Sequence, residues 1–168
     1  MSRGPRHLEV LFCDDIRQEV GNKFSYMGVY TGELNVPTAP VLLPKLCIAV
    51  KACTNIDDPF EALEVRIIKV KGDDETELLS TGPIAQPTEP PRRDNGSTRL
   101  IAHMAFMLAP LQIDEEFLLR VKAITEREEL LGTALRIHIV PPTASSTPSE
   151  IETSPKAARK RESRRERV

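Results

Sequence analysis

The segment EEFLLRVKAITEREELLGTALRIHIV, residues 115–140, decides the fold class of this chain. Apolar residues occupy every second position in 117–123 and again in 135–139. A period of two is that of a β-strand with one buried face and one wet face. The polar connection TEREELLG (125–132) separates the two runs. The segment therefore predicts a β-hairpin.

Similar patterns occur upstream. The apolar positions of 63–70 change phase at Ile67–Ile68, which predicts a β-bulge. Residues 99–108 are apolar on both faces, which indicates a central strand, although a buried helix has the same pattern. The other predicted strands are 8–12, 24–31, 46–52 and 75–81. About eight short strands at this spacing are typical of an antiparallel β-sandwich, immunoglobulin-like or C2-like.

The segment CDDIRQEVGNKFSYMGVYTGEL (13–34) does not follow a simple strand pattern. An aspartate at its start is suited to cap a short helical turn over 14–20, which Gly21 would end. The pair Gly21–Asn22 predicts a change of chain direction. Gly28 predicts that another group lies close to the second strand.

Asp14, Asp15 and Arg17 form the candidate interaction site. Paired carboxylates are able to share a proton or bind a divalent cation. Adjacent residues on a strand point to opposite faces, however, so a cap and an ion pair with Arg17 explain the cluster more simply. Both interpretations stay open at this point.

The same segment resembles the N-terminal signature of a family of small bacterial and phage-borne proteins of unknown function. The matching residues are Asp14, Asp15, Arg17, Gly21, Lys23, Ser25, Gly28, Tyr30 and Gly32. The hairpin at 115–140 is also similar to the paired terminal strands of immunoglobulin-like sandwiches. The resemblance supports the fold class and implies no activity.

Composition divides the chain into an acidic body and a basic tail. Seven basic and two acidic residues fall in 156–168, a net charge of +5, which leaves −7 for the rest of a chain whose total is −2. Such a tail is able to bind nucleic acid or another polyanion weakly and without sequence preference. Its basic residues are Lys156, Arg159, Lys160, Arg161, Arg164, Arg165 and Arg167.

The sequence predicts one domain. We expect a disordered N-terminus at 1–6, a β-sandwich at 7–140, and a disordered Pro/Ser/Thr-rich linker with the basic tail at 141–168. Two Pro-rich segments, 36–44 and 82–96, are predicted to be a crossover and a long loop. The chain contains no apolar run of membrane-spanning length.

The remaining candidate metal ligands and nucleophiles are acidic residues and cysteines that lie far apart in the sequence. Acidic residues occur in three predicted loops, at 57–58, 73–75 and 114–116, where calcium would require the loops to converge. The three cysteines, Cys13, Cys47 and Cys53, lack the spacing of a zinc finger or a disulfide framework, and none has the sequence context of a nucleophile. We therefore expect a reduced, cytoplasmic protein with no cofactor.

The sequence is best explained by a non-enzymatic protein-binding or adaptor module with an unknown protein partner. One alternative is a metal-dependent or enzymatic domain that uses Asp14, Asp15 and Arg17. A second alternative is nucleic-acid or polyanion binding through the basic tail. No membrane partner is expected, and the oligomeric state is left open.

Overall fold

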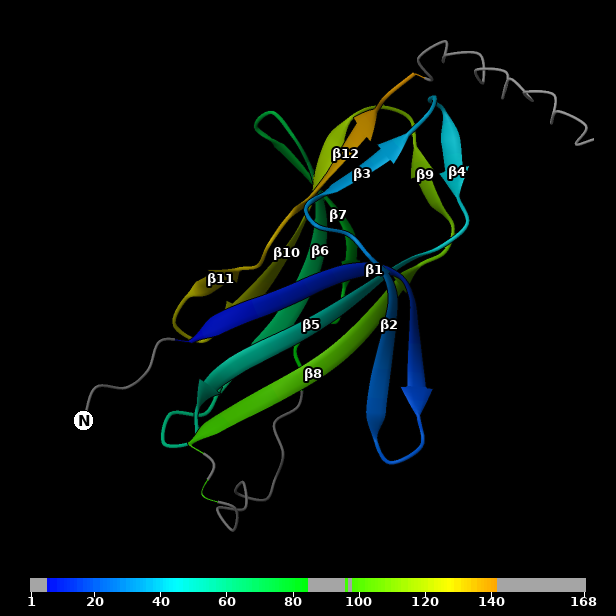
Figure 1. Ribbon diagram of the computed structural model, residues 1–168. Coiled ribbons are helices and arrows are strands. Elements are labelled where there is room, and N and C mark those ends of the chain that lie inside the picture. The colour runs from blue at the N-terminus through cyan, green and yellow to red at the C-terminus, as the bar shows by residue number, and fades with distance from the viewer. Residues whose placement is uncertain (1–5, 85–95, 97, 142–168) are drawn as a thin grey trace, which may run out of the picture.

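The computed structural model describes residues 6–84, 96 and 98–141 of the 168-residue chain. These residues form twelve strands and no helix, which confirms the all-β prediction (Figure 1). It follows that no described segment forms a helix able to cross a membrane.

The first sheet has four strands in the order β2-β1-β5-β8, and all its neighbours are antiparallel. Its strands are β1 (His7–Glu19), β2 (Lys23–Val29), β5 (Leu46–Asn55) and β8 (Arg99–Leu108). Both β2 and β8 lie at an edge of this sheet.

The second sheet has the order β3-β12-β10-β6-β7, with β11 paired to β10. Its strands are β3 (Glu33–Val36), β6 (Leu63–Lys71), β7 (Asp74–Ser80), β10 (Phe117–Thr125), β11 (Glu129–Leu131) and β12 (Leu135–Ile139). The pair β3–β12 is parallel, so the antiparallel prediction fails at this edge. A separate two-stranded sheet joins β4 (Val41–Leu43) to β9 (Leu111–Ile113).

The core lies between the two larger sheets, since both contribute residues to one buried cluster. Alternate residues of β5 and β10 are fully buried there, because each strand places every second side chain on its inner face. The members contributed by these two strands are Leu46, Ile48, Val50, Ala52, Phe117, Leu119, Val121 and Ala123. The apolar period of two in 117–123 therefore identified a core strand correctly.

The predicted strand pairing and bulge are confirmed, whereas the predicted helical turn is not. β10 and β12 pair as predicted, and the register of β6 with β7 shifts between Ile67 and Ile68, as expected for a bulge. The helical turn predicted at 14–20 is wrong, because β1 continues as a strand to Glu19. The connection at 125–132 also contains β11, whose Leu130 is buried in the core.

Residues 99–108 form a strand, but it lies at an edge of its sheet rather than at the centre. Apolar residues on both faces normally indicate neighbours on all sides. The described part of the chain supplies a neighbour, β5, along only one edge of β8. Packing among the described residues accounts for the inner face of β8, where Ala102, Met104 and Phe106 contact the core, but not for the apolar residues of its outer face.

An ionic network closes one end of the molecule. The side chain of Arg6 is only 4% exposed and donates hydrogen bonds to Glu126 Oε1 at 2.7 Å and to the carbonyl of Pro59 at 2.9 Å. Its guanidinium also lies 4.8 Å from the centre of the Phe60 ring. Arg6 belongs to the segment predicted to be disordered, whose residues 1–5 lie outside the described residues.

Candidate functional site

The candidate site identified from the sequence lies where β1 bends away from the body of the molecule. Cys13 pairs with Cys47 of β5 on one side and with Val29 of β2 on the other. Beyond Cys13, β1 pairs only with β2, and the two strands form a projecting hairpin (residues 14–29) at the lower right of Figure 1. Gly21 and Asn22 at its tip have φ of 82° and 57°, which confirms the predicted turn.

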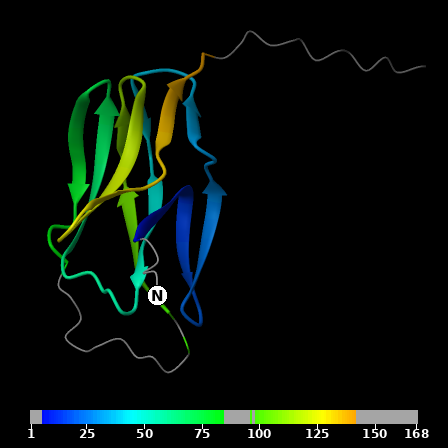
Figure 2. The same cartoon turned by 90° about the vertical axis from the view of Figure 1, so that its left-hand side faces the viewer.

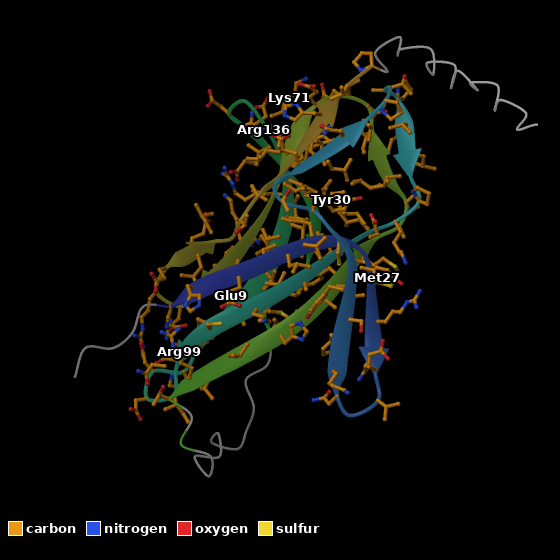
Figure 3. All side chains as sticks on the ribbon, in the orientation of Figure 1. Glu9, Met27, Tyr30, Lys71, Arg99 and Arg136 are labelled. Atoms are coloured by element: carbon orange, nitrogen blue, oxygen red, sulfur yellow. The ribbon has the colours of Figure 1, made fainter. Side chains whose placement is uncertain are left out.

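Asp14 lies on one face of this hairpin. Its Oδ1 accepts a hydrogen bond of 2.5 Å from the hydroxyl of Tyr30, which Figure 3 labels close to the bend. Gly28 makes room for this carboxylate, because a Cβ atom built at Gly28 would lie 1.9 Å from Asp14 Oδ2. The predicted close approach to the second strand is therefore confirmed, and the approaching group is the Asp14 side chain.

The Tyr30 hydroxyl should lose its proton at a higher pH than an ordinary tyrosine. Burial and the hydrogen bond to Asp14 raise the pKa of Tyr30 to about 12, from an ordinary value of 10.0. The chain has two tyrosines and no tryptophan, so the variant Tyr26→Phe leaves Tyr30 as the sole tyrosine. We expect its ultraviolet phenolate absorbance to appear with a midpoint near pH 12. Adding Asp14→Asn to Tyr26→Phe should lower that midpoint. A midpoint near pH 10 in the single variant Tyr26→Phe would contradict the hydrogen bond between Tyr30 and Asp14.

Asp15 lies on the opposite face and is held by two cations. Lys45 Nζ lies 2.6 Å from Asp15 Oδ1, and Arg17 Nε lies 3.0 Å from Oδ2. These hydrogen bonds, that of Lys45 first, lower the pKa of the Asp15 carboxyl. The ion pair of Asp15 with Arg17 is confirmed, whereas Asp14 has a different partner. The two carboxylates are thus not brought together on one ligand.

The projecting hairpin folds toward the outer face of the four-stranded sheet, the face turned away from the core. The ring centroids of Phe24 and His103 lie 4.7 Å apart in an edge-on arrangement. The Tyr26 hydroxyl lies 3.1 Å from Nε2 of His103. Two side chains of β2 therefore anchor the hairpin to β8, in agreement with its place beside the sheet in Figure 2.

A shallow hollow of about 200 Å³ lies on this outer face under Tyr26. Ligand pockets for small molecules typically measure roughly 300–1,000 Å³. The hollow is lined by Glu9, Val10, Leu11, Tyr26, Ala49 and Lys51. Its size and lining do not resemble those of an enclosed catalytic cavity.

Two adjacent rows of the outer face are apolar. One row across the sheet consists of Val29, Cys13, Cys47 and Met107, and a second of Leu11, Ala49 and Ala105. The inner members of these rows are buried, whereas the ends reach solvent: Met107 is 59% exposed and Val29 is 48% exposed. Ile101, farther along β8, is also 59% exposed. Two of the most exposed large apolar side chains of the described residues therefore lie on the outer face of β8.

The inner face of β8 is incompletely covered as well. The inward residues of β5 are fully buried, but those of β8 are all only partly buried. They are Leu100, Ala102, Met104, Phe106 and Leu108. β8 therefore exposes apolar side chains on both faces, next to a backbone edge that no described strand covers.

The two edges of the second sheet are protected differently. β7 carries acidic side chains and lies next to the bulge in β6, two devices that discourage pairing with another chain. β3, at the opposite edge of the same sheet, has only four residues. β8 has ten residues, no proline and a single charged side chain, Arg99, so it is the longest edge strand in the described ranges and lacks these devices.

The three cysteines all point to the outer face and are buried. Cys13 lies opposite Cys47, and Cys53 lies opposite His7. Burial raises the pKa of both the Cys13 and the Cys53 thiols. An activated cysteine nucleophile requires the opposite shift. The meeting of Cys53 with His7 therefore does not make a catalytic pair.

The three acidic loops do not all meet: the 73–75 turn lies at the same end of β6 as Glu115, whereas 57–58 lies elsewhere. Asp58, in the loop after β5, forms ion pairs with Arg6 and Arg127. Glu115 forms ion pairs with Lys69 and Lys71 near the far end of β6. Asp58 and Glu115 thus lie at different ends of the molecule and each faces cations, so the geometry does not support a calcium site shared by all three loops.

Sequence reasoning missed several residues of this region. Lys45, His103 and His7 gave no motif, because their roles depend on which strands pair and in which register. The sequence contains one signal for the exposed strand β8, the apolar residues on both faces of 99–108. The same pattern also predicts a strand at the centre of a sheet. The basic tail and most of the 82–96 loop lie outside the described residues.

Comparison with known proteins identifies a family. The model of a family of unknown function (DUF6941) matches residues 9–140, which include all of the described strands except the first two residues of β1. This agrees with the expected membership of a family of unknown function, whereas the signature in 13–34 and an origin in bacteria or phages remain predictions. No curated protein matches the chain.

Proposed function

The chain belongs to this family of unknown function, and we propose that it is a non-enzymatic protein-binding module whose binding element is β8. The observation that carries the proposal is a ten-residue edge strand that no described strand covers, with exposed apolar side chains on its outer face and partly exposed ones on its inner face. Such an edge adds a strand from another chain through backbone hydrogen bonds, while alternate side chains supply specificity. An immunoglobulin-like or C2-like sandwich and a cytoplasmic location are parts of the same proposal.

The occupant that β8 itself fits is β8 of a second copy. In an antiparallel pair centred on Met104, the inner face would place Ala102 opposite Phe106 and Leu100 opposite Leu108. The outer face would place Ile101 opposite Met107 and His103 opposite Ala105. Three of these four pairings join a large side chain to a smaller or flexible one, and none joins like charges. Cross-strand pairs of this kind stabilise a sheet.

The non-enzymatic part of the proposal is supported by the described side chains. Asp14 and Asp15 have separate partners, Tyr30 and Lys45 respectively. The thiol of Cys53 has a raised pKa, and the hollow beside it is small. None of these arrangements combines a nucleophile, a base and a cavity for a substrate.

A lysine on the exposed face of β8 tests the binding element. Met107→Lys should weaken self-association by about 100-fold, because the two-fold axis would introduce the change twice and each lysine removes an apolar contact. Sedimentation velocity over a range of micromolar concentrations measures the effect. The matched control is Leu131→Lys on β11, since Leu131 is 57% exposed against 59% for Met107.

We expect a dimer for the wild-type chain and for Leu131→Lys, and a monomer for Met107→Lys with an unchanged melting temperature. A wild-type chain that stays monomeric throughout the range would exclude the second copy as occupant. A Met107→Lys variant that dimerises like the wild type would exclude β8 as the interface.

A further inference from the structure

We propose that His7, Glu9 and Cys53 form a metal site of the zinc type on the outer face of the four-stranded sheet. This site lies on β1 and β5, and Cys53 is the strand neighbour of Ile101 on β8. The site rests on its three ligands and not on the proposed binding function. The three side chains offer an imidazole, a carboxylate and a thiol. The family has no known function, and the spacing of the cysteines in the sequence does not predict a metal site.

Strand register brings the three residues together. His7 of β1 lies directly opposite Cys53 of β5, and both side chains point outward. Glu9 follows His7 by two positions, so its side chain emerges on the same face. A nitrogen of His7, a carboxylate oxygen of Glu9 and the sulfur of Cys53 all lie within 4.8 Å of one another.

The distances suit a tetrahedral ion. Nε2 of His7 lies 3.5 Å from Oε1 of Glu9, which is too long for a good hydrogen bond. Two ligands bound to zinc at about 2.0–2.1 Å would be roughly 3.3–3.4 Å apart in a tetrahedron. A small rotation of the two side chains is therefore enough to bring both atoms to one ion. The sulfur of Cys53 lies within 4.8 Å of each of these atoms, so it needs only a small shift to become the third ligand.

The ligand chemistry favours zinc. Thiolate, imidazole and carboxylate are the three groups that zinc binds in proteins, and three such ligands leave a fourth position for water or another donor. Calcium and magnesium prefer sites made of oxygen alone. The other carboxylate oxygen of Glu9, Oε2, lies 3.6 Å from Lys51 Nζ, so this cation orients the carboxylate from outside the site.

The site is open to an ion from solvent. The side chains of His7 and Glu9 are 38% and 55% exposed, whereas Cys53 is buried beneath them. The shallow hollow lined by Glu9 and Lys51 begins beside the site. An ion entering from this side meets the two exposed ligands first and the sulfur last.

The test is titration of the purified full chain, kept reduced, with cobalt(II) and then with zinc. A thiolate–cobalt charge-transfer band and one equivalent of zinc in competition with a chromophoric chelator are expected. Cys53→Ser should abolish the band. The matched control Cys47→Ser should retain it, because Cys47 lies on the same strand and face with almost the same burial, 4% against 3%.

Glu9→Gln provides a variant that changes an exposed side chain and keeps the buried thiol. It should fold normally and lower the affinity for zinc by at least about tenfold. The proposal is overturned if the wild-type chain gives no charge-transfer band and takes up no zinc. It is equally overturned if Cys53→Ser binds as the wild type does, or if folded Glu9→Gln retains full affinity.

Discussion

Replacing Glu126 with Gln is expected to lower the free energy of unfolding at neutral pH by about 3 kcal/mol. Glu126 lies in the connection between β10 and β11, and its side chain is 16% exposed. Its Oε1 accepts a hydrogen bond from Arg6, and its Oε2 accepts hydrogen bonds from the backbone N–H groups of Glu61 and Ala62. One carboxylate thus ties the start of β1 and the loop before β6 to the β10–β11 connection.

The expected loss of stability follows from the buried charge of Arg6, which Glu126→Gln leaves without its main partner. The Arg6 side chain is 4% exposed, and removal of one partner from a buried ion pair costs about 3–5 kcal/mol. Asp58, 3.7 Å from the same guanidinium, remains as a weaker partner, so we place the expected loss at the lower end. Glu129→Gln is the matched control: Glu129 is 48% exposed and pairs with Lys122 at 3.3 Å, so its loss should change stability by less than about 0.5 kcal/mol.

The same interaction predicts a pH dependence. Burial of the Glu126 carboxyl raises its pKa, but the hydrogen bonds from Arg6 and from backbone N–H groups outweigh burial and lower the pKa to about 2, from 4.5. A lowered folded-state pKa contributes stability above the unfolded-state value and loses it as pH falls toward the folded-state value. Denaturant unfolding of wild type and Glu126→Gln should therefore differ fully at neutral pH and converge between pH 4.5 and about 2. A difference that does not change over this range would contradict the network.

Replacing Gly132 with Ala should cost about 1–3 kcal/mol of stability by overpacking. Gly132 follows β11, and its φ lies outside the left-handed region that favours glycine. A Cβ atom built there would lie 2.3 Å from Val10 Cγ2 and 3.2 Å from Leu8 Cδ2. Glycine is therefore required here for space, because β1 of one sheet and the end of β11 in the other pass close together.

A double-mutant cycle with Val10→Ala isolates this contact. Val10→Ala alone should destabilise the chain through lost packing. Because that change removes the colliding methyl group, the double variant should be more stable than the sum of the single changes predicts, by about 1 kcal/mol or more. Additive losses in chemical denaturation would contradict the described approach of β11 to β1.

The sequence predicted those parts of the fold whose signals are local. Alternation in 117–123 identified β10, and the phase change at Ile67–Ile68 identified the bulge. The prediction of a helical turn at 14–20 failed because an aspartate before an apolar residue is equally compatible with a strand that leaves the sheet. There, Asp14 and Asp15 each bind a partner remote in sequence, Tyr30 and Lys45.

Features that depend on strand order could not be predicted in this way. A run that is apolar on both faces, such as 99–108, has the same sequence pattern at the centre of a sheet and at an edge that is completed by another chain. The juxtaposition of His7 with Cys53 likewise depends on the register of β1 against β5, a quantity that neither residue's neighbours encode. The candidate binding edge and the candidate metal site therefore emerged only from the structure.

Amide hydrogen exchange of β8 as a function of protein concentration tests the binding edge most directly. In an isolated molecule, alternate amides of β8 lack a partner strand on their uncovered side and should exchange rapidly. When β8 of a second copy pairs with it, the same amides should become protected as the concentration rises, whereas those of the acidic edge strand β7 should not change. Exchange of β8 that is independent of concentration, and identical in Met107→Lys, would contradict a binding function for this strand.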